Sequence, residues 1–297
     1  MLSYEHIYHA GNHADILKHT VFTLIVGHLK KKETPFTVID THAGEGFYRL
    51  DDERAQKTGE LETGLKRFIA AYDDTSVHTT KKAQHVLEPF AELCKIYAVH
   101  GLYAGSPELA RCLLRKGDEL VLCELHPQAV KALTENMQQE PHFGAKAVRT
   151  HIHHRSGFEF LSSLHPPKRG LVLVDPSFEE LSDFTNCAET LTLVHQRWRG
   201  GILALWYPLT TAKGLACSRM RQSLISCAQQ LSQEPNVLDL QLTVRAPASL
   251  QGNAALYGSG LLVINSPHLL DKQLEAALPF LARALGGEDG KFSIRAY

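Results

Sequence analysis

The alternation of apolar and polar positions divides the chain into successive helices and strands. Residues 13–32 carry apolar side chains at helical spacing, which predicts a helix. Asn12 precedes them as a candidate N-cap, and the carboxylate of Asp15 lies where it would stabilise the positive end of the helix dipole. After Pro35, residues 36–39 form a short apolar run that is typical of a buried strand. This strand leads directly into a glycine-bearing turn.

Downstream, short apolar runs alternate with longer segments of helical periodicity. The predicted helices cover residues 107–115, 127–138, 157–164, 182–198 and 213–231, and the predicted strands cover residues 119–124, 145–150, 170–174, 201–206, 237–244 and 259–264. Strands that alternate with helices predict an α/β fold with a mainly parallel sheet covered on both faces. Only a loop separates the last two strands, so we expect them to pair as a hairpin that completes the sheet with one antiparallel strand.

Residues 53–101 interrupt this alternation, because they show helical patterns but almost no β-branched runs. We interpret them as an α-helical subdomain inserted into one α/β domain, which comprises residues 1–52 and 102–297. The aromatic arm before residue 13 contains too few apolar residues to anchor itself firmly. We therefore expect this arm to order over bound ligands.

Composition and charge limit the classes of function. The 297 residues are 44% hydrophobic and 21% charged, which is typical of a globular protein and excludes collagen, coiled coils and wholesale disorder. The sequence has no apolar run of the roughly 20 residues that a membrane span needs and no basic-then-apolar leader, so we expect a cytoplasmic protein without a membrane partner. Six cysteines without a CxxC pair indicate reduced thiols. Because the net charge is −1, any contact with nucleic acid must come from a local basic patch.

Two predicted strands end in residues that suit a ligand site, and ligands of such sheets bind at the carboxyl ends of strands. The first strand ends in Asp40-x-x-x-Gly44-x-Gly46, whose glycines let the backbone approach a ligand closely. The second ends in Glu124, which is placed to accept hydrogen bonds from a ribose diol. The interval between the glycines and this acid is far longer than the roughly 20 residues of an NAD fingerprint. A structural turn and a solvated strand end are the alternative interpretations.

A third strand, residues 170–174, ends in Asp175-Pro176-Ser177-Phe178. The acid and the carbonyl of Pro176 could hold an exocyclic amino group while Phe178 stacks on the base. Enzymes that act on an extruded base need such an arrangement. The alternative is a strand followed by a turn, with the proline as a break and the phenylalanine in the core.

Further motifs accompany these strand ends along nearly the whole chain. They are Tyr4-x-His6-x-x-His9-Ala10-Gly11-Asn12-His13-Ala14-Asp15-Ile16-Leu17-Lys18-His19, Asp40-Thr41-His42-Ala43-Gly44-x-Gly46, Gly105-Ser106-Pro107, Glu124-Leu125-His126-Pro127, Leu205-Trp206-Tyr207-Pro208 and Val263-Ile264-Asn265. Together they make the sequence resemble the RlmJ family, bacterial adenine-N6 methyltransferases of 23S ribosomal RNA. The resemblance implies a Rossmann-like class I methyltransferase that uses S-adenosylmethionine, with a small helical subdomain inserted after the first strand.

The resemblance also implies roles for individual residues. The positions that correspond to cofactor contacts are His19, His42, Gly44, Ser106, Glu124, Ser156 and Gly157. The catalytic motif corresponds to Asp175, Pro176 and Phe178. Tyr4 and Lys18 fall on the substrate-facing N-terminal segment, where we expect Lys18 to contact phosphate or the extruded nucleotide. The implied partner is 23S ribosomal RNA rather than the finished ribosome, bound by a monomer.

Two segments depart from the family pattern. The family motif is Asp-Pro-Pro-Tyr, whereas Ser177 and Phe178 occupy its last two positions here. The family usually has an acid at the position of Ser156, where it would accept a hydrogen bond from the adenine amino group of the cofactor. These departures leave one alternative open, a non-catalytic nucleic-acid-binding protein linked to the use of external DNA. A DNA adenine-N6 methyltransferase is another alternative, because the motif contacts the base and not the sugar.

Histidines are unusually frequent, with 17 in the chain. His9 and His13 stand four residues apart, and His151, His153 and His154 form a cluster. No carboxylate accompanies them as in an HExxH motif, so we expect no metal.

Basic residues gather on one predicted helix. Lys213, Arg219 and Arg221 are either phosphate contacts or a solvated helix face. The sequence pattern alone does not separate these two interpretations.

Overall fold

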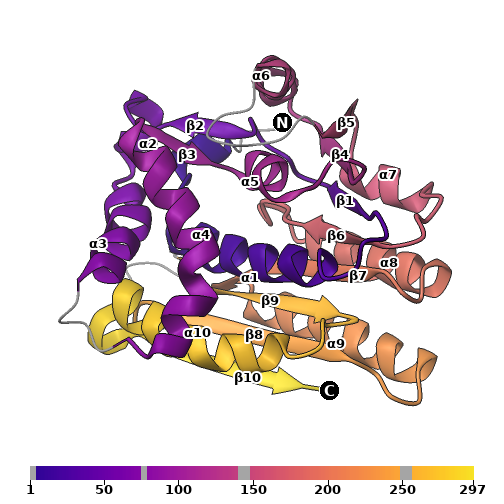
Figure 1. Ribbon diagram of the computed structural model, residues 1–297. Coiled ribbons are helices and arrows are strands. Elements are labelled where there is room, and N and C mark those ends of the chain that lie inside the picture. The colour runs from indigo at the N-terminus through magenta and orange to yellow at the C-terminus, as the bar shows by residue number, and fades with distance from the viewer. Residues whose placement is uncertain (1–4, 75–78, 140–147, 248–255) are drawn as a thin grey trace.

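The computed structural model describes residues 5–74, 79–139, 148–247 and 256–297. At its centre is an eight-stranded sheet in the order β10-β8-β9-β7-β6-β1-β4-β5 (Figure 1). Its strands are β1 (Thr37–Asp40), β4 (Glu119–Glu124), β5 (Arg149–His154), β6 (Gly170–Val174), β7 (Ile202–Thr210), β8 (Val237–Thr243), β9 (Leu256–Ile264) and β10 (Lys291–Ala296). The neighbouring strands in the part β7-β6-β1-β4-β5 of the sheet pair in parallel. The pairs β7–β9, β9–β8 and β8–β10 are antiparallel.

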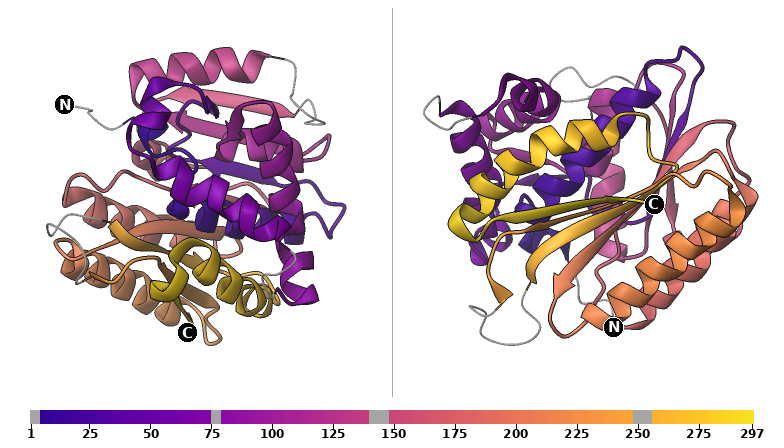
Figure 2. Two further views of the ribbon diagram at one scale, coloured as in Figure 1. Left: turned by 90° about the vertical axis from the view of Figure 1, so that its left-hand side faces the viewer. Right: turned by 90° about the horizontal axis from the view of Figure 1, so that it is seen from below.

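Helices cover both faces of this sheet. They are α1 (His13–Leu29), α2 (Glu53–Lys57), α3 (Arg67–Asp73), α4 (Lys81–Val99), α5 (Ser106–Leu113), α6 (Pro127–Gln138), α7 (Gly157–Ser162), α8 (Ser182–Arg197), α9 (Gly214–Leu231) and α10 (Leu270–Gly286), with the short turns η1 (His6–Tyr8), η2 (Glu62–Lys66) and η4 (Gly287–Asp289). A separate two-stranded sheet joins β2 (Phe47–Arg49) and β3 (Leu102–Ala104). Helices α1, α4, α5 and α10 pack on one side of the large sheet and α7, α8 and α9 on the other (Figure 2). None of the helices in the described ranges is long and apolar enough to cross a membrane.

Strand β6 shows why the sequence forms this layered structure. Its side chains alternate between the two hydrophobic cores, with Leu171 and Leu173 in the core beneath α1 and with Val172 and Val174 in the core beneath α8. All five residues of the strand are buried. A parallel strand covered on both faces needs such continuous apolar character, so the α/β fold with a parallel centre is confirmed.

The C-terminal part of the sheet differs from the prediction. The hairpin between β8 and β9 is confirmed, but β9 does not complete the sheet, because α10 and β10 follow it and β10 forms the edge. Two strands, β9 and β10, therefore run against the others instead of one. Pro279 lies inside α10 and breaks up its helical pattern, and most of β10 is exposed or half-buried, so neither has a strong sequence signature.

Strand β5 lies further along the chain than predicted. The prediction placed a strand at residues 145–150, whereas β5 spans Arg149–His154 and residues 145–147 lie outside the described residues. Its register pairs Glu119 with Arg149 and Glu124 with His154. The strand is an edge built from a histidine-rich segment, so it lacks the apolar run on which the prediction relied.

The predicted insertion, residues 53–101, is mostly helical. It contains α2, η2, α3 and α4, which pack against α1 and α10. Leu65, Phe68, Leu87 and Phe90 belong to the same hydrophobic core as the sheet residues beneath α1. The division of the chain into a main domain and a separate subdomain remains a prediction.

The described part of the N-terminal arm is anchored, contrary to the expectation from its composition. Ile7 and Ala10 are buried in the core beneath α1. The backbone N–H of Gly11 donates to Asp15 Oδ2 (2.9 Å), and its carbonyl accepts from the N–H of Leu65 (2.7 Å). Polar contacts with its neighbours thus compensate for the arm's small number of apolar residues.

Candidate active site

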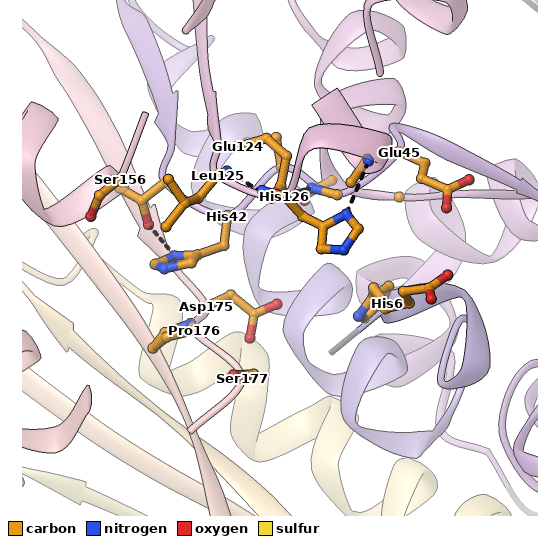
Figure 3. Close-up of a pocket in the computed structure, with 18 of the residues that line it drawn as sticks. His6, His42, Glu45, Glu124, Leu125, His126, Ser156, Asp175, Pro176 and Ser177 are labelled. Carbon is orange, nitrogen blue, oxygen red and sulfur yellow. Dashed lines mark hydrogen bonds between the residues drawn. The ribbon is translucent and has the colours of Figure 1, made fainter. Parts of the chain in front are cut away.

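The carboxyl ends of β1, β4 and β6 surround a cavity of about 340 Å³. In Figure 3 the carboxylate of Asp175 points into the space between His42, His126 and His6. Elements far apart in the sequence meet here because the adjacent parallel strands end at the same edge of the sheet. A cavity of this volume falls within the range of sites that bind small molecules and cofactors.

The turn after β1 forms one wall through its backbone. Gly44 has a φ of +59°, and a Cβ there would lie 2.2 Å from Tyr48 Oη, so the position requires glycine. The N–H of Gly44 donates to Glu124 Oε2 over 2.8 Å. The predicted glycine turn and the predicted acid are therefore in direct contact.

Glu124 accepts two more hydrogen bonds through its other carboxylate oxygen. The backbone N–H groups of Leu125 and His126 donate to Oε1 over 2.8 and 2.7 Å. A carboxylate has about four acceptor sites, so three backbone donors fix its orientation and leave capacity for a ligand hydroxyl.

Two helix starts complete this side of the cavity. Ser106 lies at the beginning of α5 and is buried at the cavity wall, and Ser156 directly precedes α7. A Cβ on Gly157 would lie 2.3 Å from the carbonyl oxygen of Thr41, so α7 approaches the end of β1 as closely as a glycine allows. The free N–H groups of a helix start are donors for polar ligand atoms.

His42 and His19 bring two imidazoles to the cavity. His42 Nδ1 lies 2.8 Å from Thr41 Oγ1, and burial lowers the pKa of its ring. Burial also lowers the pKa of His19, to about 3, although the Asp15 carboxylate opposes this shift. His19 Nδ1 contacts Tyr103 Oη (2.7 Å), but its buried Nε2 has no hydrogen-bond partner among the described residues. Such an orphaned polar atom at a cavity wall indicates a place for a polar ligand group.

Asp175 at the end of β6 is held by a buried lysine. Lys18 on α1 forms ion pairs with Asp175 and with Asp15, the latter over 2.7 Å. Burial would lower the pKa of Lys18, but the two carboxylates raise it above its ordinary value, so the ammonium stays charged. Burial would raise the pKa of Asp15, yet His6 and Lys18 hold it well below its usual range.

A second, smaller cavity of about 180 Å³ is also lined by this ion pair. Lys18, Asp175, Pro176 and Ser177 line both cavities, whereas Phe178 lines only the smaller one. Asp175 therefore stands at a wall that the two cavities share.

Phe178 differs from the exposed stacking ring that the motif suggested. The side chain is only 1% exposed, and its ring packs against Phe184 and Trp206 with centroid distances of 4.5 and 6.0 Å. Its φ of +53° is in the left-handed region, which is unfavourable for an aromatic residue. The ring thus belongs both to the core and to the wall of the smaller cavity.

The structure brings most of the predicted residues together. Those that line the larger cavity are Lys18, His19, His42, Gly44, Ser106, Glu124, Ser156, Gly157, Asp175 and Pro176. Tyr4 lies outside the described residues. Across the described ranges, no group of three or more histidine, cysteine or acidic residues is arranged for a metal ion.

Sequence reasoning missed His6, Trp206 and the ion-pairing role of Asp15. Asp15 was expected only to favour the start of α1, where its N–H does donate to the predicted N-cap Asn12 (2.9 Å). Its spacing of three residues from Lys18 on a helix was a usable signal for the ion pair. Trp206 lines the smaller cavity through the β7 motif, but nothing in the sequence placed that motif beside Asp175.

Comparisons with known proteins identify the family of this chain. The family model described as ribosomal RNA large subunit methyltransferase D, RlmJ, matches residues 33–296. The ribosomal RNA large subunit methyltransferase J of Escherichia coli K12 is 37% identical over 286 residues, which cover 95% of this chain and 93% of that protein. The protein of the same name from Haemophilus influenzae is 34% identical over 298 residues, with 96% and 94% covered.

A solved structure shows the same fold over nearly the whole chain. Protein LPL1258 from Legionella pneumophila superposes with a TM-score of 0.80 at 24% identity, and the match covers 97% of this chain and 98% of that one. The chain therefore belongs to the RlmJ family of ribosomal RNA large subunit methyltransferases.

Proposed function

We propose that this protein transfers a methyl group from S-adenosylmethionine to N6 of an adenine in 23S ribosomal RNA. The observation that carries the proposal is the position of Asp175 at the wall shared by the two cavities, paired with a buried lysine. One cavity then holds the methyl donor and the other the target base. Membership of the RlmJ family supports large-subunit ribosomal RNA as the substrate.

The larger cavity suits S-adenosylmethionine by the chemistry of its donors and acceptors. Glu124 retains acceptor capacity for the ribose hydroxyls, and the backbone at Gly44 and the starts of α5 and α7 offer close approach. Ser156 replaces an acid of the family, so it would accept a weaker hydrogen bond from the adenine amino group. When bound, this cofactor supplies a methyl group that its sulfonium already activates.

The smaller cavity suits the target adenine. The Asp175 carboxylate and the carbonyl of Pro176 accept hydrogen bonds from the N6 amine, which directs the nitrogen lone pair towards the larger cavity. Formation of a bond between this nitrogen and the methyl group, with loss of that group from the sulfonium, would make the nitrogen cationic, and Asp175 would then accept one of its protons. Lys18 and Asp15 fix the orientation of Asp175 before the reaction, and such positioning supplies most of the catalysis.

Phe178 forms a wall of the base cavity rather than a freely exposed stacking surface. Its packing against Phe184 and Trp206 places aromatic rings next to Pro176 and Ser177. The Ser177 hydroxyl accepts a long hydrogen bond (3.5 Å) from the N–H of Glu179, a local constraint at the position where the family has a second proline.

Methylation mapping tests the proposal. We expect 23S ribosomal RNA from cells that lack the gene to lose one N6-methyladenosine, and the wild-type protein but not Asp175→Ala to restore it. In vitro, the protein should methylate free 23S RNA faster than it methylates finished large subunits. We also expect the protein to sediment as a monomer and to be found in the cytoplasmic fraction of the cell. An unchanged methylation map would overturn the proposal, and methylation of DNA in preference to RNA would replace the substrate.

A further inference from the structure

Lys213 directly precedes α9 and reaches the loop that follows Asp175. Its Nζ donates to the backbone carbonyls of Phe178 and Glu179, the latter over 2.9 Å. Its own N–H donates to Thr210 Oγ1 (3.3 Å), and its carbonyl accepts from Cys217 within α9. The lysine is therefore fixed at its backbone by β7 and α9 and at its amine by the loop.

The loop needs such an external contact. Phe178 has a φ of +53°, which places its Cβ close to its own backbone in a conformation that costs free energy for a non-glycine residue. The family's second proline, which would restrict this loop, is Ser177 here. The charged Lys213 amine donates hydrogen bonds to the carbonyls of Phe178 and Glu179. These two bonds stabilise the strained turn.

The structure separates the three basic residues that the sequence placed on one helix. Arg221 is largely buried, and its guanidinium pairs with Asp239 and lies over the ring of Tyr207. Arg219 is exposed on α9, about 1.7 turns beyond Lys213. Lys213 alone of the three lines the base cavity, together with Asp175 and Phe178.

We propose that Lys213 is a positioning residue for the methyl transfer. It holds the left-handed turn at Phe178, and through this turn it sets the position of the Pro176 carbonyl and of the Asp175 carboxylate. This inference rests on the proposed function, because it assigns Lys213 to the same catalytic loop. The carboxylate of Asp183 adds electrostatic attraction to the Lys213 amine.

A set of three variants tests this role. Lys213→Met removes the charge at nearly constant length, Lys213→Arg retains donors, and Arg219→Met removes the same charge from the exposed face of the same helix. We expect Lys213→Met to lower kcat about 10- to 100-fold, the effect of losing hydrogen bonds from a charged donor. The KM for RNA and the affinity for S-adenosylhomocysteine should stay within about threefold, Lys213→Arg should recover most of kcat, and Arg219→Met should match the wild type.

Backbone amide exchange of residues 177–183, followed by mass spectrometry, gives a readout that needs no activity. We expect faster exchange there in Lys213→Met and unchanged exchange in Arg219→Met. If the wild-type protein failed to methylate RNA, the proposed function would fail while this measurement still decided whether Lys213 holds the loop.

Two results would overturn the inference. The first is wild-type exchange and kcat in Lys213→Met, which would make the contact dispensable. The second is an unchanged kcat with a raised KM for RNA and a shallower dependence of RNA affinity on salt, which would make Lys213 a phosphate contact instead.

Discussion

The two cavities that meet at Asp175 are built in different ways. In the larger one, turns that directly follow strands bring backbone donors to the wall, such as the Gly44 turn whose N–H binds Glu124. The smaller one brings together residues of elements far apart in the chain, such as Trp206 of β7 and Lys213 at α9, which do not line the larger one. Backbone donors persist when side chains change, whereas a cavity of side chains depends on each residue. The departure at Ser156 should therefore change the ligand affinity of the larger cavity less than the departure at Ser177 changes that of the smaller cavity.

Removal of Asp175 should have the largest effect, because both cavities share this group. We expect Asp175→Ala to lower turnover about 10²- to 10⁴-fold, as for other positioned acid–base groups. Calorimetric affinity for S-adenosylhomocysteine should change little, since backbone groups and Glu124 would hold the cofactor. Glu180→Ala, at an exposed position of the same loop, is the matched control. Turnover within a few-fold of the wild type would show that Asp175 is structural.

Lys18 supports the smaller cavity from α1. Lys18→Met leaves the Asp15 and Asp175 carboxylates without their shared cation, so we expect a loss of about 3–5 kcal/mol in the free energy of unfolding. Because the ammonium pairs with these carboxylates, the salt dependence of RNA binding should stay parallel to that of the wild type. Urea unfolding measures the loss of stability, and RNA titration at several salt concentrations measures the salt dependence. Lys82→Met, at an exposed position, is the control for both. A slope reduced by one phosphate contact would restore the phosphate-binding role that the sequence suggested.

Glu124 tests the larger cavity alone. Glu124→Ala removes the acceptor of three backbone N–H groups and of the proposed ribose contact, so S-adenosylhomocysteine should bind about 10- to 100-fold more weakly. RNA affinity should remain unchanged, because this residue does not line the smaller cavity. Titration calorimetry with both ligands decides this, and NAD should not bind either protein. Equal losses for RNA and cofactor would contradict the division of the site into two cavities.

His19 gives the smallest effect, which appears in the pH dependence of stability. Burial lowers its pKa to about 3, so below pH 6.5 the unfolded chain binds a proton that the folded chain does not. Stability therefore falls as the pH falls, by about 2 kcal/mol between pH 6.5 and 5 for this residue. His19→Gln should flatten the profile by that amount, whereas His85→Gln, at an exposed position, should leave it unchanged. Parallel profiles for the wild type and His19→Gln would show that this histidine does not titrate as its burial implies.

The same contrast explains which parts of the site the sequence could predict. Gly44, Glu124 and Asp175 each follow a strand directly, and the parallel strands β1, β4 and β6 bring their ends to one edge of the sheet. The contact between Lys18 and Asp175 spans 157 residues and depends on how α1 crosses the sheet. No local pattern encodes such a crossing. The sequence therefore suggested a phosphate contact for Lys18, whereas in the structure this residue pairs with two carboxylates.

The sequence by itself determined the α/β class, the parallel centre of the sheet, the hairpin of β8 and β9 and the strand ends that carry the site. Hydrophobic periodicity is a local property, and these features follow from it. The tertiary structure decided the position of β5, the presence of α10 and β10, the buried state of Phe178 and the partners of Lys18 and Lys213. These features depend on packing between segments that are far apart in the chain, where burial and charge pairing override the preferences of the individual residues.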